Sequence, residues 1–375
     1  MADHPPTKIR LTLSPIRLML GALSLLLADA VFAAPDTNSP YINYSYGPAT
    51  EWIDIGIQPL WLPSSLITET MRRDVLLRQE LAARGKGIRF HPFLNGPDIN
   101  TLLHEGRLVA GVGGDLPALR ACIRDRVQVL SLMDLSFTAV VAREALLPTD
   151  LRGLRIGYVP GSNAHYTLLK TLDAAAIPES DVQLVETPIN RMPGYLQSKR
   201  IDAFAAWEPI PSLATSQRAG QVVFRHLSRG YLYFADAFAT NHPHLVDSLL
   251  ASQIRALNWL KRSEANQGKA LDWALTAAQE LTGLQAPPDR DELRILAYQG
   301  LRRLGSIPVV TTQESGETGY LARLFAFLRG IGQVPDSLTW NQVAPCFQKT
   351  VLQKILADPV THRLRQDSFR PEDPS

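Results

Sequence analysis

Three glycine-containing turns place backbone N–H groups and small side chains where a ligand could bind. They are Asn95-Gly96-Pro97-Asp98, Gly113-Gly114-Asp115-Leu116-Pro117 and Gly161-Ser162-Asn163-Ala164-His165. Each follows an expected strand and precedes an expected helix, and ligands of open α/β sheets bind beyond the carboxyl ends of the strands. The first N–H groups of such helices are unpaired and carry a partial positive charge, which suits an oxyanion. The turns therefore favour a sulfonate, carboxylate, nitrate or phosphate-like group.

The same turns also have an interpretation that involves no ligand. Asp115 and Ser162 could cap the helices that follow them, because both residue types accept hydrogen bonds from the first free N–H groups. For Asp115 a cap is the better interpretation, since its negative charge is the wrong sign for an anion.

A fourth candidate segment runs from Arg200 to Pro209, where a strand of small residues ends in an aromatic residue, an acid and a proline. Trp207 could form one wall of a cleft, with Glu208 available to an ammonium or hydroxyl group. Alternatively, Trp207 is a half-buried core ring and Glu208 is only the residue before a proline turn.

Nothing in the sequence predicts catalysis, a metal site or a cofactor. The eight histidines show no HExxH spacing, and neither a GxSxG nor a Walker sequence occurs. Two cysteines, Cys122 and Cys346, are too few for a thiolate metal site, and the sequence leaves open whether they pair. The formal net charge is +2 without a run of like charges, which argues against nucleic acid and anionic membranes as partners.

The N-terminus is typical of a secretory signal peptide. Lys8, Arg10 and Arg17 precede an apolar run over residues 18–27, and small alanines follow. The run is shorter than the roughly 20 residues that span a bilayer. We expect residues 1–33 to be removed by cleavage after Ala33, which gives a periplasmic protein; an uncleaved anchor or a buried helix is the alternative. No cysteine lies near that point, which argues against a lipid anchor.

The elements that position these segments alternate between strand and helix, which predicts parallel sheets in two lobes. A chain of 375 residues is long enough for two lobes or for one large α/β unit. The apolar segments 127–132 and 137–142 are typical of buried parallel strands. The other expected strands are 52–57, 88–93, 108–112, 154–159, 182–185, 203–206, 222–226 and 231–237, and the expected early helices are 64–84, 98–105, one that begins at Pro117, 164–175 and 192–198.

From residue 243 onward the pattern predicts helices over 243–262, 266–281, 289–303 and 315–330. These helices have no strands of their own, so we expect them to return and cover the first lobe. The polar residues 363–375 predict a disordered tail.

Four blocks resemble, in order, those of the alkanesulfonate-, taurine- and nitrate-type binding proteins of ABC importers. The first extends from Phe93 to Pro117 and includes both early glycine turns, and the second covers residues 151–169. The third is Ile201-Asp202-Ala203-Phe204-Ala205-Ala206-Trp207-Glu208-Pro209, and the fourth is residues 238–243 followed by a long helix. The resemblance extends over roughly residues 51–335.

This resemblance implies an α/β protein with the two-lobed type II periplasmic-binding fold, in which each lobe is a mostly parallel sheet flanked by helices. Lobe 1 would comprise residues 51–139 and 237–345, lobe 2 residues 140–236, and two hinge strands would join them around a ligand cleft. It also implies a monomer that delivers a sulfonate, taurine or a nitrate-like solute to an ABC permease in the inner membrane. The ligand-binding positions carried over are Gln58, Gly114, Asp115, Gly161, Ser162, His165, Trp207 and Glu208.

Two departures from the family pattern concern the identity of the solute. Val109-Ala110 stands where the family usually has an Ile/Val-Asp pair, and the bulky Trp61 lies near the start of the first helix. Trp61 could narrow the pocket or offer an aromatic face, or it could be a surface or core ring.

Two other classes of protein share these features. A thiamine-precursor synthase has a similar fold but would call for a cysteine cluster and iron chemistry, which this sequence lacks; a thiamine-precursor-related binding protein is a variant of that alternative. A solute-sensing module of a membrane receptor would have the same cleft.

Overall fold

The computed structural model describes residues 41, 43–47, 51–144, 147–283, 290–305, 307–366 and 369–370. The predicted signal peptide therefore lies outside the described residues. The chain from Tyr44 onward is one compact unit, which is described here by itself. Among its described helices, none combines the length and the apolar character needed to cross a bilayer.

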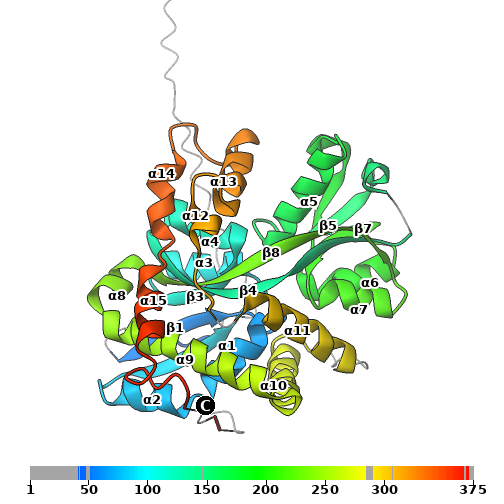
Figure 1. The fold of residues 1–375 in the computed structure, drawn as a ribbon. Helices are drawn as coiled ribbons and strands as arrows, with labels where there is room; N and C mark the ends of the chain where they lie inside the picture. The colour runs from blue at the N-terminus through cyan, green and yellow to red at the C-terminus, as the bar shows by residue number, and fades with distance from the viewer. Residues whose placement is uncertain are drawn as a thin grey trace, which may run out of the picture. The chain divides into compact units, whose positions relative to one another are not determined.

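One eight-stranded sheet forms the centre of this unit, in the order β2-β1-β3-β8-β4-β7-β5-β6 (Figure 1). Strand β1 pairs in parallel with β2 and β3, and β5 pairs in parallel with β6 and β7. The strands are β1 (Trp52–Ile57), β2 (Gly87–Pro92), β3 (Ala110–Gly114), β4 (Val127–Ala142), β5 (Arg155–Tyr158), β6 (Gln183–Glu186), β7 (Ala203–Trp207) and β8 (Gln221–Ala235).

Two long antiparallel strands, β4 and β8, join the parallel ends of the sheet (Figure 1). Each was expected as two short strands, and β4 was expected in a parallel sheet. Both expectations are wrong, because each pair of segments is one strand, and β4 pairs antiparallel with both β7 and β8. The polar residues between the apolar segments of β4 lie where its register with β8 shifts, near Leu132 and Asp134.

The helices cover the sheet and agree with most of the expected ranges. Up to β8 they are α1 (Ser64–Arg72), α2 (Val75–Ala82), α3 (Gly96–His104), α4 (Asp115–Arg124), α5 (Asn163–Ala174), α6 (Met192–Gln197) and α7 (Ile210–Ser216), with short 3-10 helices at Pro148–Leu151, Glu179–Asp181 and Ile189–Arg191. After β8 they are α8 (Asp236–Asn241), α9 (Pro243–Arg262), α10 (Glu264–Thr282), α11 (Arg290–Leu304), α12 (Thr312–Ser315), α13 (Tyr320–Gly330), α14 (Trp340–Val343) and α15 (Thr350–Ala357), with a 3-10 helix at Ala344–Cys346.

The single helix expected over residues 64–84 is two helices, because Asp74 starts a new one. Its side chain accepts hydrogen bonds from the backbone N–H groups of Leu76 and Leu77, the N-cap arrangement that begins α2. The same carboxylate forms a fully buried ion pair with Arg255 of α9, at 2.8 Å.

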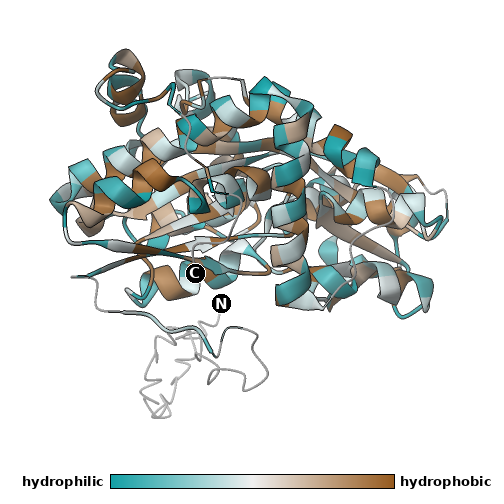
Figure 2. Cartoon of the chain, turned by 90° about the horizontal axis from the view of Figure 1, so that it is seen from below, coloured by the Kyte–Doolittle hydropathy of each residue, from teal (hydrophilic) through white to brown (hydrophobic). Residues whose placement is uncertain are grey.

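The late helices pack on elements from the first part of the chain, as expected. Helices α9 and α10 contact α1, α9 also contacts α2, and α13 contacts α4. Helix α5 packs on β4 and β7 instead. In Figure 2 the strands are mostly hydrophobic, whereas the surrounding helices carry hydrophilic residues as well.

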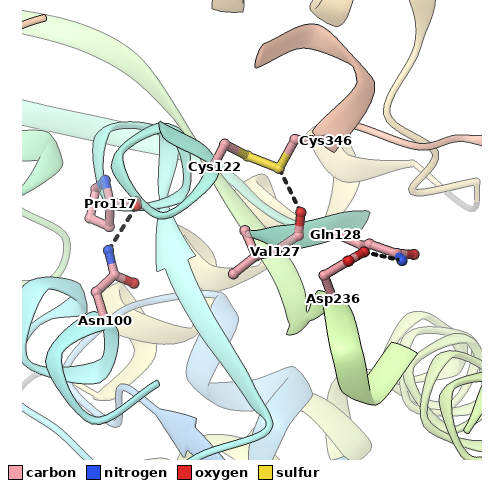
Figure 3. The surroundings of a disulfide bond; sticks show 7 residues. All are labelled: Asn100, Pro117, Cys122, Val127, Gln128, Asp236 and Cys346. Carbon is pink, nitrogen blue, oxygen red and sulfur yellow. Dashed lines mark hydrogen bonds between the residues drawn. A yellow bond between two sulfur atoms is a disulfide. The ribbon is translucent and has the colours of Figure 1, made fainter. Parts of the chain in front are cut away.

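A disulfide joins Cys122 of α4 to Cys346, two residues that are 224 positions apart in the sequence (Figure 3). The bond ties the segment around α14 to α4. C-terminal to the disulfide, described residues of the predicted tail also contact the folded unit. Arg363 pairs with Glu80 at 2.8 Å, and the Phe369 ring lies against Trp259. Residues 371–375 lie outside the described residues.

Candidate functional site

A small pocket lies where the carboxyl ends of β1, β3 and β7 meet the starts of α3, α4 and α5. Its free volume is about 10 Å³, which is room for about one water molecule. A solute can therefore enter only if the pocket opens. The lining residues are Gln58, Trp61, Gly96, Gly114, Pro117, Ser162, Asn163 and Trp207.

The first wall is formed by the ends of β1 and β7. Gln58 follows β1 and donates from Nε2 to the carbonyl of Val112 at 2.8 Å. Trp207 ends β7 and donates from Nε1 to the carbonyl of Leu60 at 3.1 Å. The N–H of Leu62 in turn donates to the carbonyl of Glu208 at 3.1 Å, so the loop that carries Trp61 is fixed to the end of β7.

Asn163 fills the place where α4 was expected to hold an anion. Its Oδ1 accepts a hydrogen bond from the N–H of Leu116 at 3.2 Å, and its Nδ2 donates to the carbonyl of Arg229 at 3.1 Å. A Cβ atom on Gly114 would lie 1.9 Å from Asn163 Oδ1, so only glycine permits this approach. Gly114 therefore lines the pocket. The nearby N–H group of Leu116, at the start of α4, already donates to Asn163.

Asp115 is the first residue of α4, is fully buried and does not line the pocket. Its Oδ1 accepts from the N–H of Leu116 at 2.8 Å, and its Oδ2 accepts from the N–H of Arg229 and from the Tyr320 hydroxyl. Burial raises the pKa of Asp115 to about 6, although these hydrogen bonds oppose the rise. These contacts are all with the protein itself, and the N-cap position of α4 is Gly114.

The turn before α5 is held by its own side chains. Ser162 Oγ accepts from the N–H of His165 at 3.2 Å and donates to the carbonyl of Val159, whereas His165 Nδ1 accepts from the N–H of Gly161 at 3.1 Å. Gly161 has a φ of +72°, which favours glycine. Burial, with a smaller effect of Arg120, lowers the pKa of His165 to about 4, so its ring is neutral at pH 7.

Arg120 of α4 places a cation beside this turn. A Cβ atom on Gly161 would lie 2.9 Å from Arg120 Nη1. The guanidinium donates to the neutral amide oxygen of Gln333 at 2.8 Å. No spacing in the sequence pointed to Arg120, because its position depends on how α4 meets α5.

Glu208 precedes Pro209, the N-cap residue of α7, and contacts the first turn of that helix. Its Oε2 accepts from the N–H of Ser212 at 3.2 Å, the residue is 3% exposed, and burial raises its pKa.

The structure thus brings four of the eight predicted positions to one pocket, namely Gln58, Gly114, Ser162 and Trp207. The other four, Asp115, Gly161, His165 and Glu208, do not line the pocket and hydrogen-bond to the protein itself. The prediction missed Gly96, Pro117 and Asn163, although all three belong to the glycine turns, and it left the place of Trp61 open. Among the described residues, no three His, Cys, Asp or Glu side chains are grouped to hold a metal ion.

Comparison with known proteins gives one family model and one curated relative. Residues 129–275 match the model of the NMT1-like family. Over 190 residues the chain is 27% identical to a protein of Escherichia coli (strain K12) named an aliphatic sulfonates-binding protein. The match covers 48% of this chain and 59% of that relative, so the chain spans under two thirds of its length.

Solved structures with the same fold cover most of the chain. The alkanesulfonate-binding protein of Xanthomonas axonopodis pv. citri, bound to MOPS, is 20% identical with a TM-score of 0.61 over 80% of this chain and 99% of that one. The periplasmic nitrate-binding protein of Synechocystis PCC 6803 is 11% identical with a TM-score of 0.59 over 87% and 93%.

An enzyme also has this fold. A desulfurization enzyme is 16% identical with a TM-score of 0.53 over 82% of this chain and 99% of that one, so the fold alone does not separate binding from catalysis. The chain has the type II periplasmic-binding fold and resembles the sulfonate- and nitrate-binding proteins of ABC importers.

Proposed function

We propose that this chain is a periplasmic solute-binding protein that delivers a small anionic or zwitterionic solute to an ABC permease. One observation carries the proposal: five segments that are separate in the sequence supply the walls of a single pocket at the carboxyl ends of the strands. The relatives named for sulfonate and nitrate binding support the class of solute.

The pocket would open by movement of one half of the sheet against the other. Lobe 1 would comprise residues 51–139 and 237–345, lobe 2 residues 140–236, and β4 and β8 would be the hinge strands. Gln58, Gly96 and Gly114 would lie on one side of the cleft, and Ser162, Asn163 and Trp207 on the other. A solute that contacts both sides favours the closed form through its higher affinity for that form.

The anionic group of the solute would bind at the turn before α5. At the start of α4 a carboxylate, Asp115, and the amide of Asn163 already accept from the N–H of Leu116. By contrast, Arg120 supplies a positive charge next to Gly161. The α5 end is therefore the better place for a sulfonate or a similar group.

The lining of the pocket supports binding rather than catalysis. None of its lining side chains is ionisable, so the pocket itself holds no general acid or base. The disulfide is consistent with an oxidising compartment such as the periplasm.

A thermal-shift screen of the mature chain from Ala34 tests the proposal, after unfolding and refolding to remove any bound solute. The panel contains taurine, alkanesulfonates, nitrate, bicarbonate and sulfate. One class should raise the melting temperature in a saturable way, because ligand binding stabilises the native state. The Ser162→Glu variant should lose this shift and keep its own melting transition. A panel with no shift would contradict the proposal.

A further inference from the structure

We propose that α13 is a latch that holds α5 against α4 when the two proposed lobes close, so that part of the population is closed even without a solute. The inference rests on the proposed function, because it assumes that the lobes move. It adds an element outside the solute pocket that sets how easily the lobes separate.

Helix α13 lies beside α4 and is fixed to it at both ends (Figure 1). In its first turn, the Tyr320 hydroxyl donates to Asp115 Oδ2. Just after its last turn, Gln333 accepts a hydrogen bond from Arg120 at 2.8 Å. The disulfide ties the chain that follows α13 to α4 as well. We therefore expect α13 and α4 to move together.

The first turn of α13 is also held by β8, one of the two proposed hinge strands. The guanidinium carbon of Arg229 lies 3.6 Å from the centre of the Tyr320 ring, and Arg229 pairs with Glu314 at 2.6 Å. The Nε2 atom of His226 lies 3.3 Å from the Tyr320 hydroxyl. This end of the latch therefore lies at the hinge.

Phe327, two turns further along α13, contacts α5. Its ring meets the Tyr166 ring edge to face, with the centroids 5.5 Å apart, and Lys170 Nζ lies 4.7 Å from its centroid. Tyr166 and Lys170 are four residues apart, so they lie on the same face of α5. The Tyr166 ring also packs edge to face on His226, with the centroids 5.4 Å apart.

Opening of the proposed cleft would break the Phe327 contacts. Helices α4 and α13 belong to the proposed lobe 1 and α5 to lobe 2, so their separation moves Phe327 away from Tyr166 and Lys170. Ring pairs and cation–π contacts each change an equilibrium constant by about two- to tenfold. Such contacts favour closure without preventing opening. None of these three residues is among the described residues that line the solute pocket.

Small-angle X-ray scattering of the refolded mature chain, without any solute, tests the latch. Phe327→Ala should raise the ratio of open to closed forms about tenfold, because it removes both contacts with α5. Its radius of gyration should therefore exceed that of wild type, while the scattering remains that of a compact chain. Lys170→Met removes only the cation and should give a smaller increase. Added to Phe327→Ala, it should have no further effect.

Arg329→Ala is the matched control on the same helix. Arg329 is exposed and lies over the Phe325 ring of α13 itself, so its removal should leave the radius of gyration unchanged. If Phe327→Ala fails to fold, Lys170→Met provides the same test, because it changes a partly exposed side chain.

The outcomes separate the latch from the proposed function. A radius of gyration equal to that of wild type in both Phe327→Ala and Lys170→Met would overturn the latch. A lower melting temperature of Phe327→Ala with an unchanged radius would also overturn it, because the role of the ring would then be structural alone. These measurements contain no solute, so they decide on the latch even if no compound of the thermal-shift panel binds, which would contradict the proposed function instead.

Discussion

At the scale of single residues, the pocket depends on how closely Gly114 approaches Asn163. Both positions lie within turns that the sequence singled out. Their contact could not be predicted, because it joins the start of α4 to the start of α5, and the Leu116–Asn163 hydrogen bond beside it spans 47 positions. Sequence patterns could indicate which turns face the same edge of the sheet, but not which N–H groups the protein itself would use. Asp115 shows the same limit, since a helix cap and a ligand contact look alike in sequence.

A double-mutant cycle tests this contact. Gly114→Ala places a methyl group 1.9 Å from Asn163 Oδ1, so we expect it to reduce the free energy of unfolding by about 1–3 kcal/mol, as overpacking does. Asn163→Ala makes room, so the double variant should lose less than the sum of the two single changes. Urea unfolding measures all three. Strictly additive losses would show that the two residues do not meet.

The raised pKa of Asp134 predicts how stability changes with pH. A carboxyl with a pKa of about 8 in the folded state, and near 3.9 when unfolded, binds its proton more tightly in the folded protein. Its contribution is therefore fully present below about pH 4 and is lost as the pH rises toward 8. Asp134→Asn removes this dependence.

The free energy of unfolding of Asp134→Asn, relative to that of wild type, should therefore rise from pH 5 to pH 8. Urea unfolding at the two pH values measures the difference. Asp115, whose pKa is about 6, contributes with the same sign in both proteins. A difference that stays constant with pH would contradict the assigned shift.

At the scale of elements, most strands and helices could be predicted from the sequence. Strand β1 has the predicted bounds, and α9 matches residues 243–262. The sequence predicted two short strands in place of each of β4 and β8, because Asp134, Ser136 and Gly230 interrupt their apolar patterns. Those residues lie where the two strands pair, and buried hydrogen bonds and a close approach by Trp61 accommodate them.

The disulfide between α4 and the 3-10 helix Ala344–Cys346 gives a prediction at this scale. Removing it with Cys122→Ser and Cys346→Ser should reduce the free energy of unfolding by about 2–5 kcal/mol, since it closes a long loop in the unfolded chain. Urea unfolding of oxidised and reduced wild type provides the matched control, because reduction should reproduce the double variant. Equal stability of the oxidised and reduced protein would contradict this role.

At the scale of the whole molecule, the type II periplasmic-binding fold could be predicted from the resemblance of four sequence blocks. The continuous sheet could not, because a pattern of local periodicity does not show which strands pair across the two halves. The assignment of lobes therefore remains a prediction, and so does the hinge at β4 and β8. Its physical basis is that β4 and β8 link the parallel group β2-β1-β3 to the parallel group β7-β5-β6.

Small-angle X-ray scattering of the refolded mature chain, with and without a saturating solute from the thermal-shift panel, tests the central claim most directly. A pocket with about 10 Å³ of free volume admits no solute, so binding requires an open form that closes around the ligand. We predict that the radius of gyration falls when the solute is added and that Ser162→Glu abolishes the change. Identical scattering curves at saturation would contradict closure of two lobes on a solute.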